Sequence, residues 1–396
     1  MMDSITDALE NTRLSDLEQV HLRPQDSGTS EIDNVPSYLF RVASPLSYGE
    51  TNERWVLSES VYQNRSSSTE DIFSNLDNEK RTRVAEMLNL HLRWWPQNGD
   101  QQDNFVSWTS SLLFAIQYIY YRHLSRRDGS DLADIKLYVI DTARFPRGTF
   151  IRDMDLIDIF CESDESLKDF QSLRQRPDYY FGEYLSQGAL EIKNKCQVIP
   201  AEILFEQGRL RRIQPQFAEL QPARGRARPE WAKEVIRLRR TIYPNNLPVL
   251  SLEDMLARLE AIEEIIHHVA PDWRFPIAIY LAALMGSESL IEGKEMVNDS
   301  TFFSYFRSKS FKEEGFNPSN FKVIAPDTMP ELKQVNKLVH EISKYLQMSY
   351  AMENGYAFLT ADPHKMLARK RQRILAKLAT VRMLCKDVAS AISKET

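Results

Sequence analysis

The chain has 396 residues, 27% of them charged and 42% hydrophobic, which is typical of a soluble globular protein with enough apolar surface for real cores. Its formal net charge of -6 argues against nucleic acid as the main partner, because nucleic-acid-binding domains carry an excess of basic residues. No apolar run approaches the ~20 residues of a membrane helix, and the three widely spaced cysteines do not make a disulfide framework.

The N-terminus lacks the basic start and apolar run of a signal peptide. Together with the sparse cysteines, this predicts an intracellular protein, cytoplasmic or nuclear, with no membrane partner. The cysteines and histidines also lack the spacing of metal ligands, so we expect no bound metal.

The first half of the chain alternates strands, helices and loops. Residues 1–35 are polar and predict a flexible N-terminal segment. Aromatic and β-branched residues at 38–42 predict a strand, in which Arg41 stands in an apolar context and needs a partner or a surface. Asp77 is a suitable N-cap for an amphipathic helix that runs to about Trp94.

A hydroxyl-rich corner follows. Phe105 and Val106 read as a strand, residues 107–111 carry four hydroxyl groups, and an apolar helical pattern continues to about Leu124. Further strands are predicted at 136–141 and 198–205. Strands separated by long loops and a few helices predict an α+β domain over residues 36–207.

The second half has a different pattern. Residues 208–228 are rich in arginine and proline and predict a linker. Residues 229–396 predict an all-α domain, with Ser251 capping one helix and another helix at 331–352. Apolar residues that step by four and three form a coiled-coil-like stripe near the C-terminus: Ile374, Leu378, Val381, Cys385, Val388 and Ile392.

Three short blocks occur in order in the first half. They are an arginine in a strand, the hydroxyl-rich corner and a glutamate that leads a strand: Leu39-Phe40-Arg41-Val42, Ser107-Trp108-Thr109-Ser110-Ser111 and Glu183-Tyr184-Leu185. In these blocks the chain resembles the ADP-ribosyltransferase superfamily, and it also looks like a group of uncharacterised fungal proteins that share them. The resemblance covers roughly residues 36–205 and implies an ADP-ribosyltransferase-like fold for that part of the chain.

The resemblance implies that NAD is the substrate and that ADP-ribose passes to an unknown acceptor or to water. It implies that Arg41 holds a phosphate or ribose oxygen through its fork of donors. Hydroxyls of Ser107, Thr109 and Ser110 would bind the nicotinamide ribose, and Glu183 would be the catalytic carboxylate beside the scissile bond.

Three points stay open at this level. Family members that modify arginine have Glu or Gln two positions before the catalytic glutamate, where this chain has Phe181, so NAD hydrolysis, another acceptor or loss of catalysis are all consistent. The serine motif begins at Ser107 or at Trp108. Arg54 is an alternative to Arg41 as the phosphate ligand.

Other polar residues favour structural roles. His91 and His123 are single histidines on predicted helices, a pattern more typical of surface or core positions than of ligands. Asp153, Asp155 and Asp158 lack the loop pattern of a cation site. The rival hypothesis for the whole chain is a catalytically inactive protein whose C-terminal helices bind a protein partner.

Overall fold

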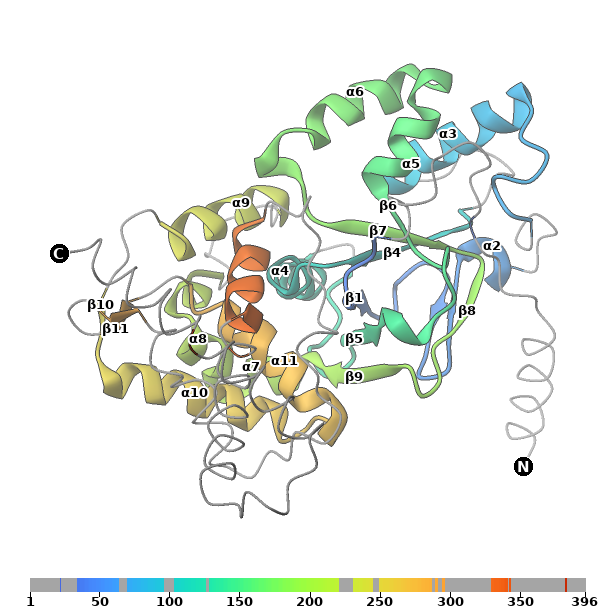
Figure 1. Cartoon of the computed structure of the whole chain (residues 1–396). Coiled ribbons are helices and arrows are strands. Elements are labelled where there is room, and N and C mark those ends of the chain that lie inside the picture. Colours follow the sequence, from blue (N-terminus) through green and yellow to red (C-terminus); the bar gives the residue numbers. More distant parts are fainter. Residues whose placement is uncertain are drawn as a thin grey trace, which may run out of the picture.

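The fold is known from a computed structural model. It describes residues 22, 34–63, 70–95, 103–125, 128–220, 231–244, 249–286, 289–290, 294–295, 329–340, 342 and 382. Within them the chain is mixed α+β with antiparallel sheets, which confirms the predicted class (Figure 1). The C-terminal stripe and nearly all of the predicted N-terminal segment lie outside the described residues.

The strands are β1 (Tyr38–Ala43), β2 (Glu50–Thr51), β3 (Trp55–Leu57), β4 (Phe105–Thr109), β5 (Lys136–Asp141), β6 (Ile151–Arg152), β7 (Glu183–Gln187), β8 (Ala189–Glu191), β9 (Cys196–Pro200), β10 (Val249–Leu250), β11 (Ser289–Leu290) and β12 (Lys294–Glu295). The helices are α2 (Glu59–Tyr62), α3 (Asn78–Arg93), α4 (Leu112–Leu124), α5 (Asp153–Phe160), α6 (Glu165–Arg174), α7 (Ala201–Phe205), α8 (Arg209–Ile213), α9 (Trp231–Ile242), α10 (Leu252–Ile266) and α11 (Pro271–Ala283). Residues 330–340 form a further helix.

A six-stranded sheet in the order β6-β7-β4-β1-β5-β9 forms the centre, and every neighbouring pair in it is antiparallel. The register sets Thr109 opposite Glu183 across β4 and β7, and Phe40 opposite Thr109 across β1 and β4. The three strands that carry the sequence blocks are therefore adjacent, although they come from distant parts of the chain.

One face of this sheet packs against the small sheet β2-β3-β8. The core between them contains Leu39, Val56, Trp108, Tyr138 and Leu190. Because side chains alternate along a strand, Trp108 faces this core while its neighbours Ser107 and Thr109 face the other way.

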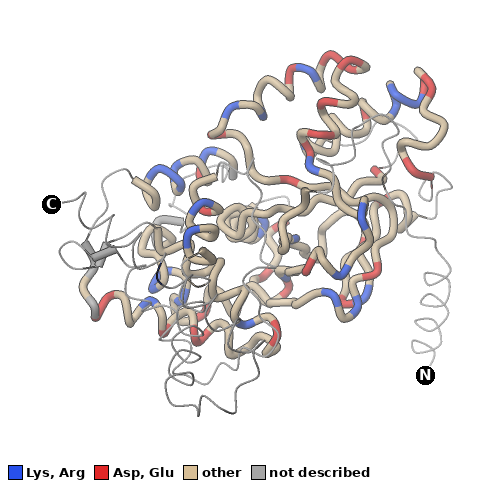
Figure 2. The backbone as a smooth tube through the Cα atoms, in the orientation of Figure 1, with Lys and Arg blue, Asp and Glu red and all other residues tan. Residues whose placement is uncertain are grey.

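Helices cover the other side. Figure 1 shows α4 between the sheet and the helices of the second half, with α3, α5 and α6 together beside β6 and β7. Apolar residues from β1, α4, α8, α10 and α11 belong to one continuous core. Figure 2 shows few charged residues along the central strands, so any charge there requires a specific partner.

The predicted linker is wrong in its first part. Residues 209–213 form α8, and Leu210, Ile213 and Phe217 are buried in the core that joins the two halves. Arginines hide the periodicity there, because their charged heads reach acids such as Glu264 while the apolar residues between them pack inward. Residues 221–230 lie outside the described part of the chain.

Other elements differ in detail. The strand predicted at 198–205 ends at Pro200, and residues 201–205 form helix α7 instead. Pro200 ends the strand pairing and precedes the first helical turn. The second half contains the short sheet β10-β11-β12 besides its helices, so it is not strictly all-α. The helix capped by Ser251 is confirmed, with Ser251 Oγ accepting from Asp254 N at 3.0 Å. In the described ranges, no helix is both long and apolar enough to span a bilayer.

Candidate active site

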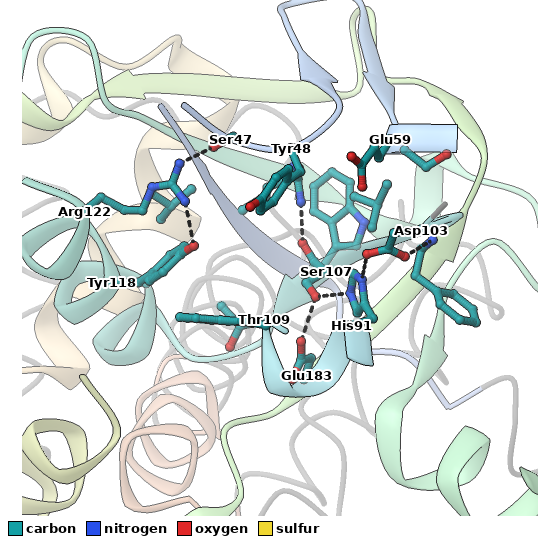
Figure 3. Close-up of a pocket in the computed structure, with 18 of the residues that line it drawn as sticks. Ser47, Tyr48, Glu59, His91, Asp103, Ser107, Thr109, Tyr118, Arg122 and Glu183 are labelled. Carbon is teal, nitrogen blue, oxygen red and sulfur yellow. Dashed lines mark hydrogen bonds and ion pairs between the residues drawn. The ribbon is translucent and has the colours of Figure 1, made fainter. Parts of the chain in front are cut away.

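A pocket of about 460 Å³ lies over the three central strands (Figure 3). Arg41 of β1, Ser107 and Thr109 of β4 and Glu183 of β7 all line it. The volume is within the ~300–1,000 Å³ typical of small-molecule sites. Helices α3 and α4 complete the walls with polar and aromatic side chains.

Glu183 is the first residue of β7 and is only 9% exposed. Its Oε1 accepts a hydrogen bond from Ser107 Oγ at 2.7 Å, and its Oε2 accepts one from Arg174 Nη2 at 2.7 Å. Ser107 and Glu183 are diagonal neighbours on one face of the sheet, since Thr109 is the residue directly opposite Glu183. The two donors compensate for burying the carboxylate and fix its plane.

Arg174 is shared between two carboxylates. Besides Glu183, its Nε lies 3.8 Å from Oδ2 of Asp153, a fully buried residue at the start of α5. Burial raises the pKa of Asp153 to about 7; Arg174 opposes this rise and the charge of Glu183 adds to it. Asp153 Oδ2 has no hydrogen-bond partner within the described ranges, so no hydrogen bond to this oxygen offsets the cost of burying the charged form.

The neighbouring acids do not assemble a cation site. Asp155 pairs with Arg152, and Asp158 accepts from Gln171 Nε2 at 2.6 Å. Among the described residues there is no cluster of three His, Cys, Asp or Glu side chains able to hold a metal ion.

Ser107 lies at the centre of the site. Its hydroxyl bonds Glu183 on one side and lies 2.7 Å from Nε2 of His91 on the other. Its main-chain oxygen accepts from Arg41 Nη1 at 3.0 Å. One residue in the middle of β4 thus connects the arginine strand, the glutamate strand and helix α3.

His91, in the last turn of α3, lines the pocket and so departs from the structural role that its sequence context favours. Its Nδ1 is hydrogen-bonded and ion-paired to Asp103 Oδ2, and Asp103 is fixed in turn by accepting from Phe105 N at 2.9 Å. Burial lowers the pKa of His91, but the charge and hydrogen bond of Asp103 and the charge of Glu183 outweigh it, so the pKa is raised above its ordinary value.

Arg41 donates from Nε to Thr51 Oγ1 at 3.1 Å and from Nη1 to the oxygen of Ser107. Burial lowers the pKa of Arg41 to about 10, so it keeps its charge at neutral pH. Arg54, the alternative candidate, pairs with Glu191 at 3.6 Å and is not part of the described pocket lining. The geometry therefore brings Arg41, and not Arg54, to the site.

The hydroxyls of the corner separate into two groups. Thr109 lines the pocket, and its Oγ1 donates to the oxygen of Phe181 at 2.8 Å. Ser110 is fully buried, donates to the oxygen of Gly182 at 3.3 Å and is not among the described lining residues. The structure thus gives Ser110 a role in fixing the approach to β7, and its assignment as a binding residue stays a prediction.

An aromatic wall forms the other end of the pocket. Trp94 lies 4.8 Å from Tyr118 between ring centroids, and Tyr118 stacks on Tyr121 at 6.1 Å. Arg122 donates to the Tyr118 hydroxyl at 3.1 Å and to Ser47 Oγ at 2.9 Å (Figure 3). The pocket therefore has aromatic rings beside the Arg122–Asp128 ion pair at one end and the hydrogen-bonded array around Ser107 at the other.

Phe181 does not reach the pocket. It is 3% exposed and lies between two guanidinium groups, with Arg174 and Arg239 each 5.4 Å from its ring centroid. It also stacks on Phe114 at 5.3 Å. The side chain at position 181 is thus enclosed between two guanidinium groups, each of which is ion-paired to a carboxylate.

Sequence reasoning missed His91, Asp103 and Arg174. Nothing in their spacing connects them with Ser107 and Glu183, because they come from two helices and a loop that meet only in the folded chain. A histidine placed in the last turn of an amphipathic helix was the sole local signal, and it is shared by many structural histidines.

Comparison with known proteins gives one match. Residues 34–191 match a family model described as "Domain of unknown function (DUF7587)", which covers less than half of the chain. That range contains Arg41, His91, Ser107 and Glu183, and its description assigns no activity, so it does not bear on the ADP-ribosyltransferase resemblance. The chain matches no curated protein and no solved structure.

Proposed function

We propose that the pocket binds NAD and that the protein is ADP-ribosyltransferase-like, transferring ADP-ribose to an acceptor or hydrolysing NAD. One observation carries the proposal. Arg41, Ser107 and Glu183, which the sequence places in three separate blocks, line a single pocket and are joined by hydrogen bonds of 3.0 Å and 2.7 Å.

Each residue has a role that suits its chemistry. Arg41 supplies positive charge for a phosphate or ribose oxygen, since two of its three nitrogens are occupied and Nη2 has no recorded bond to the described residues. Ser107 and Thr109 supply hydroxyls beside the ribose. Glu183 supplies a fixed negative charge where an oxocarbenium-like ribose develops positive charge.

The reaction breaks the bond between ribose C1′ and the nicotinamide nitrogen. Nicotinamide leaves as a neutral ring with the bonding electron pair, and an acceptor oxygen or nitrogen forms the new bond to C1′. The acceptor then loses one proton to solvent. The buried phenyl ring of Phe181 argues against a guanidinium acceptor, because this position offers no side-chain oxygen to receive one.

The test is nicotinamide release from NAD by the purified full chain, with the label on the adenylate phosphate to separate free ADP-ribose from protein-bound ADP-ribose. Glu183→Gln is expected to slow release by about 10²–10³-fold, as expected for loss of a preorganised charge at the reacting centre. Glu191→Gln, on β8 outside the described pocket lining, is the matched control and keeps the parental rate. A folded protein that neither binds nor cleaves NAD overturns the proposal.

The rival function is binding of a protein partner by an inactive chain. The coiled-coil-like stripe that suggests it lies outside the described residues, so no contact in the structure favours it. It gains support only if NAD is inert and residues beyond 342 prove necessary for a defined complex.

A further inference from the structure

We infer that His91, held by Asp103, is a positioning residue whose bound proton aims the Ser107 hydroxyl at Glu183, so that the site is competent only while His91 is protonated. Only the predicted effect on NAD turnover rests on the proposed function. The hydrogen-bonding arrangement itself stands on the geometry of four side chains.

The number of protons shared by His91, Ser107 and their acceptors determines which group donates in each hydrogen bond. Ser107 has one hydroxyl proton, and Glu183 Oε1 at 2.7 Å is an acceptor only, so that proton goes to Glu183. The Ser107 oxygen must then accept from His91 Nε2 at 2.7 Å. His91 Nδ1 meets Asp103, another acceptor, so both ring nitrogens carry protons and the ring is an imidazolium.

Loss of one proton reverses the hydrogen bond between His91 and Ser107 and leaves the bond from His91 to Asp103 in place. A neutral His91 keeps the Nδ1 proton for Asp103, which leaves Nε2 as an acceptor. The Ser107 hydroxyl then donates to His91, and Glu183 loses the donor at Oε1 while it keeps Arg174 at Oε2. The carboxylate that faces the ribose is then held at one oxygen instead of two, and its plane is no longer fixed.

The surroundings favour the protonated form. The charged groups facing His91 are Asp103 before β4, Glu183 of β7 and Arg41 of β1. The two acids favour the imidazolium, whereas Arg41 and burial oppose it. The ring also packs edge-on against Phe105 with centroids 5.7 Å apart, which restricts its rotation.

The predicted pH profile has a definite sign. Turnover of NAD is full at pH values where His91 is protonated and falls as pH rises through its raised pKa. A histidine that acted as a general base would give the opposite limb, with turnover rising as the ring loses its proton. A nucleophilic Ser107 activated by His91 would also gain with pH.

The proton state can be measured without NAD. Nitrogen-15 NMR of the imidazole rings is expected to show both nitrogens of His91 protonated at pH 6, with a titration midpoint raised above the ordinary histidine value. Asp103→Asn and Glu183→Gln should each lower the pKa of His91, since each removes a facing negative charge. The amide introduced by Asp103→Asn keeps an oxygen for Phe105 N, so the fold is retained. A His91 that is neutral at pH 6, or indifferent to both variants, overturns the inference.

Turnover supplies the second readout. His91→Gln keeps a side-chain N–H donor for Ser107 but cannot titrate, so it should retain activity within about tenfold and lose the alkaline fall of the pH profile. His123→Gln is the matched control, because His123 Nδ1 lies 2.8 Å from the oxygen of Ser130 and the residue is outside the described pocket lining. Activity that rises with pH, or covalent labelling of Ser107 by a fluorophosphonate, contradicts the positioning role. Inert NAD with a protonated, Asp103-linked His91 would remove the proposed function and the turnover consequence while leaving the proton arrangement in place.

Discussion

Two buried arrays of charged side chains in the described part of the chain can be compared, and only one of these two faces the pocket. The pocket array joins Asp103, His91, Ser107, Glu183 and Arg174. The second array, which we name the sealed pair, is Arg239 with Glu331: Nη2 lies 2.7 Å from Oε1, and the residues are 6% and 2% exposed.

The contacts of the sealed pair join elements of the fold to one another. Ser111, the N-cap of α4, donates to Glu331 Oε1 at 2.7 Å, and Arg239 Nη1 donates to the oxygen of Tyr180 at 2.7 Å. It therefore ties α9 and the helix at 330–340 to the corner before α4 and to the segment before β7. Neither member lines the described pocket.

The difference teaches that buried charge alone does not identify a functional site. Both arrays have short, charge-assisted hydrogen bonds, but the pocket array has polar atoms beside about 460 Å³ of open volume, which the sealed pair does not line. Substitutions in the sealed pair should therefore reduce stability, and those in the pocket array should mainly reduce NAD turnover.

The largest effect on stability is expected from Glu331→Gln. It leaves the guanidinium of Arg239 buried without a countercharge, which typically costs about 3–5 kcal/mol in the free energy of unfolding. Urea denaturation measures the change. The control is Arg240→Ala, since Arg240 lies on the same helix as Arg239 but forms an exposed ion pair with Asp178. Its loss should cost no more than about 1 kcal/mol. Equal losses for the two variants would mean that Arg239 and Glu331 are not sealed from water.

Gly182→Ala should have the next largest effect. Gly182 has a φ of +64°, and a Cβ there would lie 2.2 Å from Ser110 Oγ and 2.5 Å from Met329 Cε. The positive φ costs about 1–2 kcal/mol and overpacking adds about 1–3 kcal/mol. Gly129→Ala isolates the first contribution, because Gly129 has a φ of +67° and its nearest atom is Ser125 O at 3.5 Å. If both variants unfold at the same urea concentration, the close packing of Met329 on Gly182 is wrong.

Asp153 should give stability a specific pH dependence. Its pKa rises from 3.8 in the unfolded chain to about 7 in the folded one, so between these values the folded state holds a proton that the unfolded state has lost. The free energy of unfolding therefore falls as pH rises from about 4 to about 7. Since one pKa unit corresponds to about 1.4 kcal/mol, the fall should exceed about 1 kcal/mol.

Asp153→Asn removes this slope in thermal unfolding measured from pH 4 to 7, while Asp158→Asn, exposed on the same helix, keeps it. A slope that survives in Asp153→Asn assigns the proton to another group.

The smallest effect compares two hydroxyls of the corner at residues 107–111. Ser110→Ala deletes a bond to the oxygen of Gly182 and should lower stability by about 1 kcal/mol without changing the KM for NAD. Ser107→Ala removes the donor to Glu183 and should lower kcat with a similar loss of stability. A reversal, with kcat lost only in Ser110→Ala, would show that the serine motif centres on Ser110.

The strands of the site could be predicted from sequence because their signals are local. The aromatic and β-branched run at 38–42 and the hydroxyls ahead of an apolar helix have direct physical causes, and β1, β4 and α4 lie close to the expected positions. The order of the Arg41, Ser110 and Glu183 blocks also suggested a shared site. The register of β1, β4 and β7 makes such a site geometrically possible, with Ser107 instead of Ser110 lining it.

The remainder depends on contacts between distant segments. Ser107 lies within β4 and donates to Glu183, whereas Ser110 follows the strand and donates to the oxygen of Gly182. Both contacts depend on the pairing of β4 with β7. His91 and Arg174 belong to the site because α3 and α6 pack beside β7, and no short sequence pattern predicts this packing. The boundary at 208 failed for the same reason: Leu210 and Phe217 find their apolar partners in both halves.

The most direct test of the account is calorimetric titration of NAD into the full chain and into two arginine variants. We predict binding by the parent, about tenfold weaker binding by Arg41→Lys, which keeps the charge but loses the guanidinium fork, and parental affinity for Arg54→Lys, outside the described pocket lining. Absence of binding to the folded parent, or equal weakening by both variants, would contradict the assignment of this pocket to NAD.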